Sequence, residues 1–134
     1  MEESQSGKPE TIIDIKRQKL EKLVIPTVEG CELVDINSIL YLEANKSYTH
    51  IHIQNIEKPL VSSKSLQHYE RDLQKEAFLR IHNSYIINVN RLTHYVRGDS
   101  GHVLLQNVKS PIPVSKSKKN DLLQLFGLKG SNNG

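Results

Sequence analysis

The stretch from Arg80 to Asn90, RIHNSYIINVN, places three adjacent hydrogen-bonding side chains at the start of an apolar run. His82, Asn83 and Ser84 are residue types used in metal binding, in nucleophilic catalysis and in recognition of a polar partner. A buried strand has little use for such a triplet, and a solvated loop has little use for the Tyr-Ile-Ile that follows it. The triplet therefore marks a candidate site, and the rest of the chain indicates which chemistry applies.

Catalysis by Ser84 would need His82 as a base within hydrogen-bond reach and a pair of donors for an oxyanion. The chain has no G-x-S-x-G elbow to present such a serine. It also has no glycine-rich phosphate loop, because RGDSG is typical of a hairpin turn and not of a strand-to-helix loop. A histidine that caps backbone groups is favoured over a catalytic one, and we expect no enzymatic activity.

A metal site is the second alternative, because His50 and His52 form an H-x-H pair on one face of an expected strand. Two imidazoles on one face can begin a zinc or iron site, but no third ligand follows at a suggestive spacing. Tyr48, His50 and His52 alternate with Thr49, Ile51 and Ile53, which is also the pattern of a half-buried strand with a polar face. We therefore expect no metal and no other cofactor.

The charge distribution favours an anionic partner. Residues 1–90 hold 11 Lys and Arg against 13 Asp and Glu, whereas residues 91–134 hold 7 against 2. Within the basic part, VSKSKK places Lys116, Lys118 and Lys119 in a first helical turn if Ser115 is the N-cap. Cations there oppose the helix dipole at a cost of about 0.3–1 kcal/mol each. Lysines beside the free N–H groups of a helix start indicate an anion-binding site, and phosphate binding is favoured over an unselected surface charge run.

The elements that position these residues are mostly short strands. Turn residues separate period-2 segments, with hairpins expected around Glu29-Gly30, Asn45-Lys46 and the sequence GDSG. This spacing predicts a mainly β fold of about eight to ten short strands and not a series of βαβ units. The expected strands lie within LVIPTV, CELVDI, SILYLEA, SYTHIHIQ, KPLVSS, FLRIHNSYIINVN, LTHYVR, HVLLQ and SPIPVS.

Three helices accompany the strands. A small middle helix follows Ser65, with Leu66, Tyr69 and Leu73 spaced for one buried face. Thr11–Leu23 has the composition of a linker helix. A C-terminal helix is expected to bury Leu122, Leu123, Leu125 and Phe126. We expect a disordered tail and linker helix over 1–22, one domain over 23–128 and a flexible tail over 129–134.

Composition sets the remaining limits. Cys31 is the single cysteine, so an intramolecular disulfide and a multi-cysteine zinc site are excluded. No run approaches the ~20 apolar residues of a membrane span, and no signal-peptide core follows the start. These features predict a cytoplasmic protein without a membrane partner.

Three segments together, ILYLEANKSYTHI, FLRIHNSYIINVNRL and GHVLLQNVKSPIPVSKSKK, resemble the LytTR-type DNA-binding domain. This is the effector domain of bacterial response regulators of the LytR/AlgR family, and it is usually joined to a receiver domain. The resemblance spans roughly Ile25 to Leu125. It implies an elongated β fold with loops that enter successive major grooves of DNA.

The resemblance also implies which residues face DNA. Arg80, His82 and Asn83 are expected on a loop that faces the duplex, where Asn83 can read a base edge or hold a phosphate. Family members often place His or Arg near Tyr48 and Arg at Lys116, so these departures affect base preference. The DNA-binding residues expected are Asn45, Lys46, Ser47, Tyr48, Arg80, His82, Asn83, Lys116, Lys118 and Lys119.

The sequence thus predicts a sequence-specific double-stranded DNA-binding domain that regulates transcription. The chain has no room for a receiver domain of roughly 110–120 residues, so we interpret it as an effector-domain fragment or a stand-alone regulator. A receiver domain and a second copy on DNA are the further partners considered. One alternative is a β-rich protein-interaction module that uses sheet edges, and DNA binding differs from it by weakening steeply as salt rises. A weaker alternative is a metal-dependent hydrolase at His50 and His52, which a bound-metal assay would identify.

Overall fold

The computed structural model describes residues 21–128, which form ten strands, two α-helices and two 3₁₀ turns. The helical elements are α3 (Leu66–Asp72), α4 (Lys116–Leu125), η1 (Ile36–Ser38) and η2 (Val89–Arg91). The strands are β1 (Lys22–Thr27), β2 (Gly30–Asp35), β3 (Ile39–Asn45), β4 (Tyr48–Ile53), β5 (Leu60–Ser62), β6 (Phe78–His82), β7 (Tyr85–Asn88), β8 (Leu92–Val96), β9 (His102–Leu105) and β10 (Ile112–Pro113).

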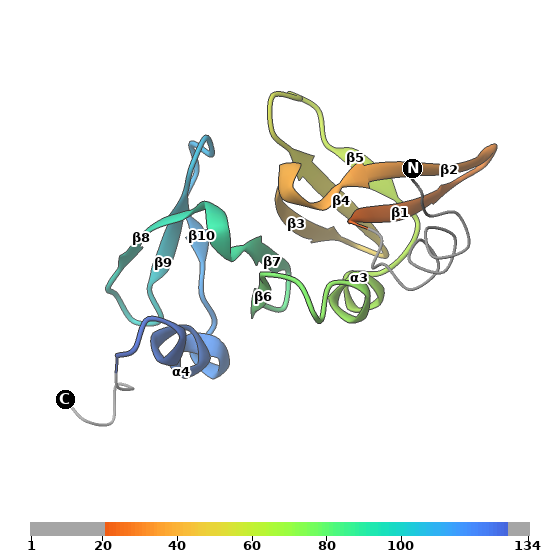
Figure 1. Ribbon diagram of the computed structural model, residues 1–134. Coiled ribbons are helices and arrows are strands. Elements are labelled where there is room, and N and C mark those ends of the chain that lie inside the picture. The colour runs from red at the N-terminus through yellow and green to blue at the C-terminus, as the bar shows by residue number, and fades with distance from the viewer. Residues whose placement is uncertain (1–20, 129–134) are drawn as a thin grey trace, which may run out of the picture.

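The strands form three antiparallel sheets placed side by side along the molecule (Figure 1). A central five-stranded sheet has the order β5-β4-β3-β7-β6. The β1–β2 hairpin lies at one end, and a three-stranded sheet of order β10-β9-β8 lies at the other end with α4. The mainly β, elongated fold expected from the sequence is confirmed.

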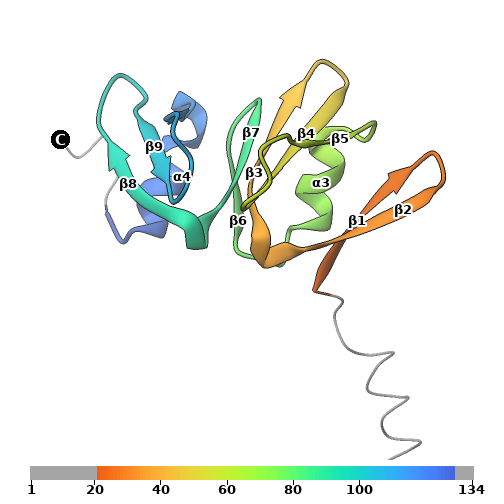
Figure 2. The same cartoon turned by 90° about the horizontal axis from the view of Figure 1, so that it is seen from above.

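Strand β7 separates two hydrophobic cores, because successive side chains of a strand point to opposite faces. Ile86 packs into a core with α3 and the β1–β2 hairpin, and Ile87 packs into a second core with the three-stranded sheet and α4. Both side chains are at most 1% exposed. Two small cores on the two faces of one sheet give the molecule its length (Figures 1 and 2).

Most of the expected elements are present. Helix α3 begins after Ser65, whose Oγ accepts a hydrogen bond from the backbone N–H of His68 at 3.1 Å. Leu66, Tyr69 and Leu73 are all buried, as their spacing predicted. The expected hairpins form as β1–β2, β3–β4 and β8–β9, although two turns are shifted by one residue. Thr27 pairs with Gly30, and Asn45 pairs with Tyr48, so Val28-Glu29 and Lys46-Ser47 are the turn residues.

Two helical expectations need correction or lie outside the described chain. Lys22 and Leu23 belong to β1 and not to the end of a helix over Thr11–Leu23. The rest of that helix and the expected tails fall on residues 1–20 and 129–134, which lie outside the described residues. Of the segment expected at 1–22, only Glu21, which precedes β1, and Lys22 are described. In α4, Leu122 and Leu123 are buried, but Leu125 and Phe126 are 51% and 36% exposed. They line a hollow together with residues of β8, which is an edge strand.

Candidate nucleic-acid interface

Hydrogen bonds between neighbouring elements bring three of the expected DNA-facing segments to one edge of the molecule. The backbone N–H of Ala44 donates to the carbonyl of Ser84 at 2.8 Å, which joins the end of β3 to the β6–β7 turn. The backbone N–H of Ser115 donates to the carbonyl of Ile81 at 2.8 Å, which joins the start of α4 to β6. The two turns and the N-terminal end of α4 consequently lie along the same long edge, the upper one in Figure 2.

The β3–β4 turn presents four exposed residues, Asn45, Lys46, Ser47 and Tyr48. Lys46 has φ 59°, a left-handed conformation that is uncommon for a residue with a Cβ atom. The Asn45 side-chain amide lies 3.4 Å from His50 Nε2, and the Tyr48 side chain is 50% exposed. The turn therefore offers one cation, one amide, one aliphatic hydroxyl and one phenol to a partner.

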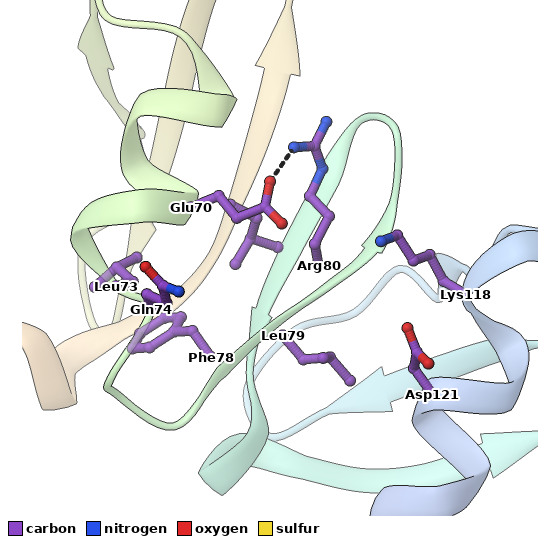
Figure 3. Close-up of a pocket in the computed structure, with 9 residues that line it drawn as sticks. Glu70, Leu73, Gln74, Phe78, Leu79, Arg80, Lys118 and Asp121 are labelled. Carbon is purple, nitrogen blue, oxygen red and sulfur yellow. Dashed lines mark hydrogen bonds and ion pairs between the residues drawn. The ribbon is translucent and has the colours of Figure 1, made fainter.

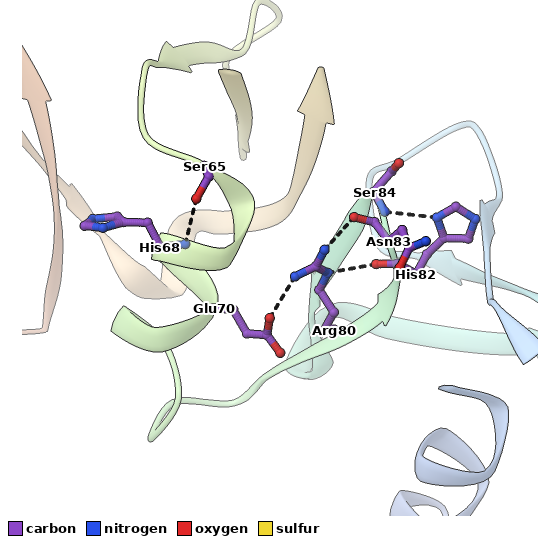
Figure 4. Close-up of polar contacts among 7 residues, drawn as sticks. All are labelled: Ser65, His68, Glu70, Arg80, His82, Asn83 and Ser84. Atoms are coloured by element: carbon purple, nitrogen blue, oxygen red, sulfur yellow. Dashed lines mark hydrogen bonds and ion pairs between the residues drawn. The ribbon is translucent and has the colours of Figure 1, made fainter. Parts of the chain in front are cut away.

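Arg80 does not lie on a loop, contrary to expectation, because β6 extends through His82. Its guanidinium makes three hydrogen bonds within the protein (Figure 4). It donates to the carbonyl oxygens of His82 and Asn83 at 2.9 and 2.6 Å and to Glu70 Oε1 of α3 at 2.7 Å. This planar set of donors holds the β6–β7 turn against α3, which an arginine can do and a lysine cannot.

His82 is also a strand residue, and its ring orientation is set by the turn. The backbone N–H of Ser84 donates to His82 Nδ1 at 3.0 Å, as Figure 4 shows. Because Nδ1 accepts, the neutral ring must carry its proton on Nε2, which is then a donor for an outside partner. The ring also packs against Tyr85 at a centroid distance of 5.6 Å. Capping of a backbone group by His82 agrees with its interpretation as a structural residue.

Asn83 is the exposed tip of the β6–β7 turn. Arg80 uses its backbone carbonyl, while its side-chain amide makes no hydrogen bond within the described residues. An available amide on a turn that is fixed through its backbone can donate to and accept from a base edge. Asn83 therefore combines an available side chain with a rigid backbone.

Helix α4 begins as expected after Ser115, which has extended backbone angles. Its hydroxyl makes no capping bond to the backbone and lies 3.3 Å from Ser117 Oγ. No acidic residue occupies the first turn. Lys116 is exposed, and Lys118 and Lys119 are half-buried, so the helix start carries cations and backbone donors with no carboxylate in the same turn to neutralise them.

Lys118 extends from α4 toward β6, where it lines a cavity of about 250 Å³ with Arg80 and Asp121 (Figure 3). Glu70 of α3 closes the opposite side of this cavity, and Leu79 and Phe78 contribute apolar walls. Two cations thus share the space between α3 and α4, and Glu70 and Asp121 balance them. Among the three lysines of α4, Lys116 is the most exposed to an outside anion.

Two exposed cations that the sequence did not single out belong to segments bonded to the elements of this edge. The carbonyl of Lys64 accepts a hydrogen bond from Thr49 Oγ1 at 2.7 Å, which places Lys64 next to Tyr48. Arg97 lies in the β8–β9 turn, and that turn is tied to the start of α4 by the Val114 N–H to Gly101 carbonyl bond of 3.0 Å. Hydrogen bonds between elements distant in the sequence bring both segments next to the candidate interface. For Lys64, the sequence did hold a signal: continuing the expected pairing of β4 with β5 places Lys64 near the start of β4.

The described residues do not gather a metal site around His50 and His52. No group of three or more His, Cys, Asp or Glu in residues 21–128 could hold a metal ion. His52 instead lies 3.1 Å from Glu43, and the polar alternation of Tyr48, His50 and His52 is that of a strand with one buried face. In the same part of the chain, no helix is long and apolar enough to cross a membrane.

A small β domain that lines one edge with cations, an available amide and a helix start belongs to the class of nucleic-acid-binding domains. A family model described as the LytTr DNA-binding domain matches residues 29–127. The chain therefore belongs to the LytTr DNA-binding domain family.

Individual relatives agree with this family. The Sensory transduction protein LytT of Bacillus anthracis is 27% identical over 109 residues, covering 81% of this chain and 44% of the relative. The CO-responsive transcriptional regulator RcoM of Rhodospirillum rubrum is 27% identical over 113 residues, covering 81% and 46%. This chain thus spans less than half the length of these relatives.

A solved structure of a LytTr DNA-binding domain from Bacillus cereus has the same fold. It superimposes with a TM-score of 0.67 and 27% sequence identity, covering 82% of this chain and all of the solved chain.

Proposed function

We propose that this domain binds a specific double-stranded DNA sequence and regulates transcription as the output domain of a two-component-type response regulator. The observation that carries the proposal is the position of Asn83. Its amide makes no hydrogen bond within residues 21–128 and lies at the tip of a turn whose backbone is held by Arg80. This turn lies between the cations of the β3–β4 turn and those of α4. Amide side chains read base edges, and flanking cations hold phosphates.

The residues of the edge divide into two roles. Asn83 reads a base edge, and Tyr48 contacts a base through its hydroxyl or packs on a thymine methyl group. Lys46, Lys116, Lys118 and Lys119 hold phosphates, joined by the Nε2–H of His82 and by the short polar side chains of Asn45 and Ser47. Arg80 uses three of its five N–H donors to hold the turn, so in this proposal it acts mainly by positioning Asn83.

The activity is binding alone, without a cofactor and without catalysis, and it takes place in the cytoplasm where the DNA is. The names of the relatives, a sensory transduction protein and a CO-responsive transcriptional regulator, support control by a signal received elsewhere in a longer protein. A receiver domain or a second copy bound beside this one on DNA would supply that control.

The test is selection of binding sites from a pool of random duplexes, followed by titration of the selected duplex and a scrambled one at several salt concentrations. The selected duplex should bind more tightly, and both affinities should fall steeply as salt rises, because bound phosphates release counterions. An interaction module that recognises protein through its sheet edges would select no sequence.

A further inference from the structure

Glu43 lies in β3, which pairs with β4 on one side and with β7 on the other in the five-stranded sheet. Its Oε1 lies 3.1 Å from Nε2 of His52 in β4, and its Oε2 accepts a hydrogen bond from the Tyr85 hydroxyl in β7 at 3.4 Å. One carboxylate thus links the middle strand to both neighbours on the same face of the sheet.

The three linked strands end at the two turns of the candidate interface. Asn45 lies two residues beyond Glu43 and opens the β3–β4 turn, and β4 leaves that turn at Tyr48. Tyr85 follows the β6–β7 turn, two residues after Asn83. A shift of β7 against β3 would therefore move Asn83 relative to Lys46 and Tyr48.

Neighbouring rings and partial burial fix the orientation and protonation of the two groups that contact Glu43, the His52 ring and the Tyr85 hydroxyl. The ring of Tyr41 stacks on His52 at a centroid distance of 4.1 Å and an interplanar angle of 7°, and His82 packs against Tyr85. Burial raises the pKa of the Tyr85 hydroxyl, so this group remains a donor at neutral pH. Burial lowers the pKa of His52 against the opposing effect of Glu43, so its neutral ring donates from Nε2. Partial burial strengthens both hydrogen bonds.

We propose that Glu43 is a positioning residue for sequence recognition: it fixes the two turns relative to each other without touching DNA. This inference rests on the proposed function and assigns it a further residue. Flexible lysines can follow a small displacement of the turns, whereas a bidentate contact of an amide to a base edge cannot. Loss of Glu43 therefore reduces discrimination between sequences and leaves the general attraction to phosphate unchanged.

The test compares Glu43→Gln and Tyr85→Phe with Glu57→Gln, which removes a carboxylate from the exposed β4–β5 loop. Affinity is measured for the selected duplex and for a scrambled duplex at several salt concentrations. Glu43→Gln should weaken the selected duplex about tenfold, within the range that one base contact supplies, with the scrambled duplex and the salt slope unchanged. Tyr85→Phe removes a single hydroxyl, so it should retain the fold and lose part of the same discrimination.

NMR of the full chain measures local changes around Glu43 that a general loss of stability would not produce. In Glu43→Gln, the His52 titration should shift to lower pH, because a carboxylate that favours the protonated ring is gone. The side-chain amide signals of Asn83 and Asn45 should also shift, and Glu57→Gln should leave all three unchanged.

Equal weakening of both duplexes, in step with a lower melting temperature, would make Glu43 a stability residue only and overturn the proposal. Unchanged discrimination in both Glu43→Gln and Tyr85→Phe would overturn it as well. If the wild-type chain itself fails to discriminate between the duplexes, the proposed function is what fails, and the amide signals still decide whether Glu43 couples the two turns.

Discussion

Nη2 of Arg80 donates to the carbonyl oxygen of Asn83 at 2.6 Å, so an arginine within a strand fixes the turn that carries the Asn83 amide. The same guanidinium reaches Glu70 at 2.7 Å, and its side chain is only 19% exposed. An arginine in this family position was expected to contact DNA directly. Its contacts within the protein also make the rigidity of the β6–β7 turn depend on α3.

Arg80→Lys should lower both stability and discrimination. Lysine keeps the positive charge but lacks the planar donors that serve three acceptors at once. The free energy of unfolding should fall by about 1–2 kcal/mol, since hydrogen bonds to charged groups contribute roughly 1.5–3 kcal/mol each and lysine restores part of that. Thermal melting and titration with the selected duplex measure the two effects. Arg71→Lys, at an exposed position of α3, is the control, and an equal effect there would contradict this role for Arg80.

Asn83→Ala should weaken binding without unfolding the domain. Its side chain makes no hydrogen bond within the described residues, so its removal leaves the melting temperature unchanged. Removal of one or two hydrogen bonds to a base edge costs about 1–3 kcal/mol of binding free energy and relaxes specificity at one base position. Asn90→Ala, which removes another exposed amide, serves as the control. A large fall in melting temperature, with binding reduced only in proportion, would assign Asn83 a structural role.

The double variant Lys118→Ala and Lys119→Ala should weaken all duplexes by similar factors. Phosphate contacts contribute affinity but carry little sequence information. Removing each lysine–phosphate pair should make the slope of log affinity against log salt shallower by about 0.9. Titration of the selected and scrambled duplexes at four salt concentrations gives both slopes. An unchanged slope would remove these lysines from the interface, and Lys22→Ala, in the hairpin at the other end of the molecule, provides a comparison.

Asn88 offers a contrasting, structural prediction. It is 2% exposed, its amide donates to the carbonyl of Ile39 at 2.8 Å, and its Oδ1 accepts from the Asn90 N–H at 3.0 Å. Asn88→Ala leaves both backbone groups without these partners, which costs about 1–3 kcal/mol for the buried Ile39 carbonyl and less for the Asn90 N–H, which water can reach. Urea unfolding should show this destabilisation, with an unchanged salt slope for DNA binding. If Asn88→Ala is as stable as the wild type, these two hydrogen bonds make no net contribution to the free energy of unfolding.

Local patterns in the sequence were sufficient for the elements and insufficient for their contacts. Alternation of apolar residues and the Ser65 cap depend on near neighbours, so the hairpins and α3 were predictable. The role of Arg80 depends on Glu70, which only the packing of α3 against β6 brings within 2.7 Å. The spacing of Leu125 and Phe126 identified apolar side chains, but it held no information on whether another element covers them.

The same limit applies to the candidate interface. Asn83 and the lysines of α4 could be proposed as DNA contacts from residue type and resemblance, because a polar triplet and cations at a helix start are visible in a sequence. Lys64 and Arg97 were not singled out, since only bonds from Thr49 to Lys64 and from Val114 to Gly101 bring their segments next to this edge. The linkage through Glu43 joins positions 43, 52 and 85, which no local pattern connects.

Binding to DNA should involve two copies on half-sites about one helical turn apart, with a monomeric domain in free solution. One edge offers few base contacts, and each good bidentate contact gives roughly 1–3 kcal/mol of discrimination. Two copies side by side on one face of the duplex roughly double that discrimination, which requires centres ~10 base pairs apart. Inserting about five base pairs, half a helical turn, should place the copies on opposite faces and abolish cooperativity. Titration of the two duplexes measures the cooperativity, and sedimentation of the free protein measures its oligomeric state. Equal cooperativity at the two spacings, or a stable dimer in dilute solution without DNA, would contradict the arrangement.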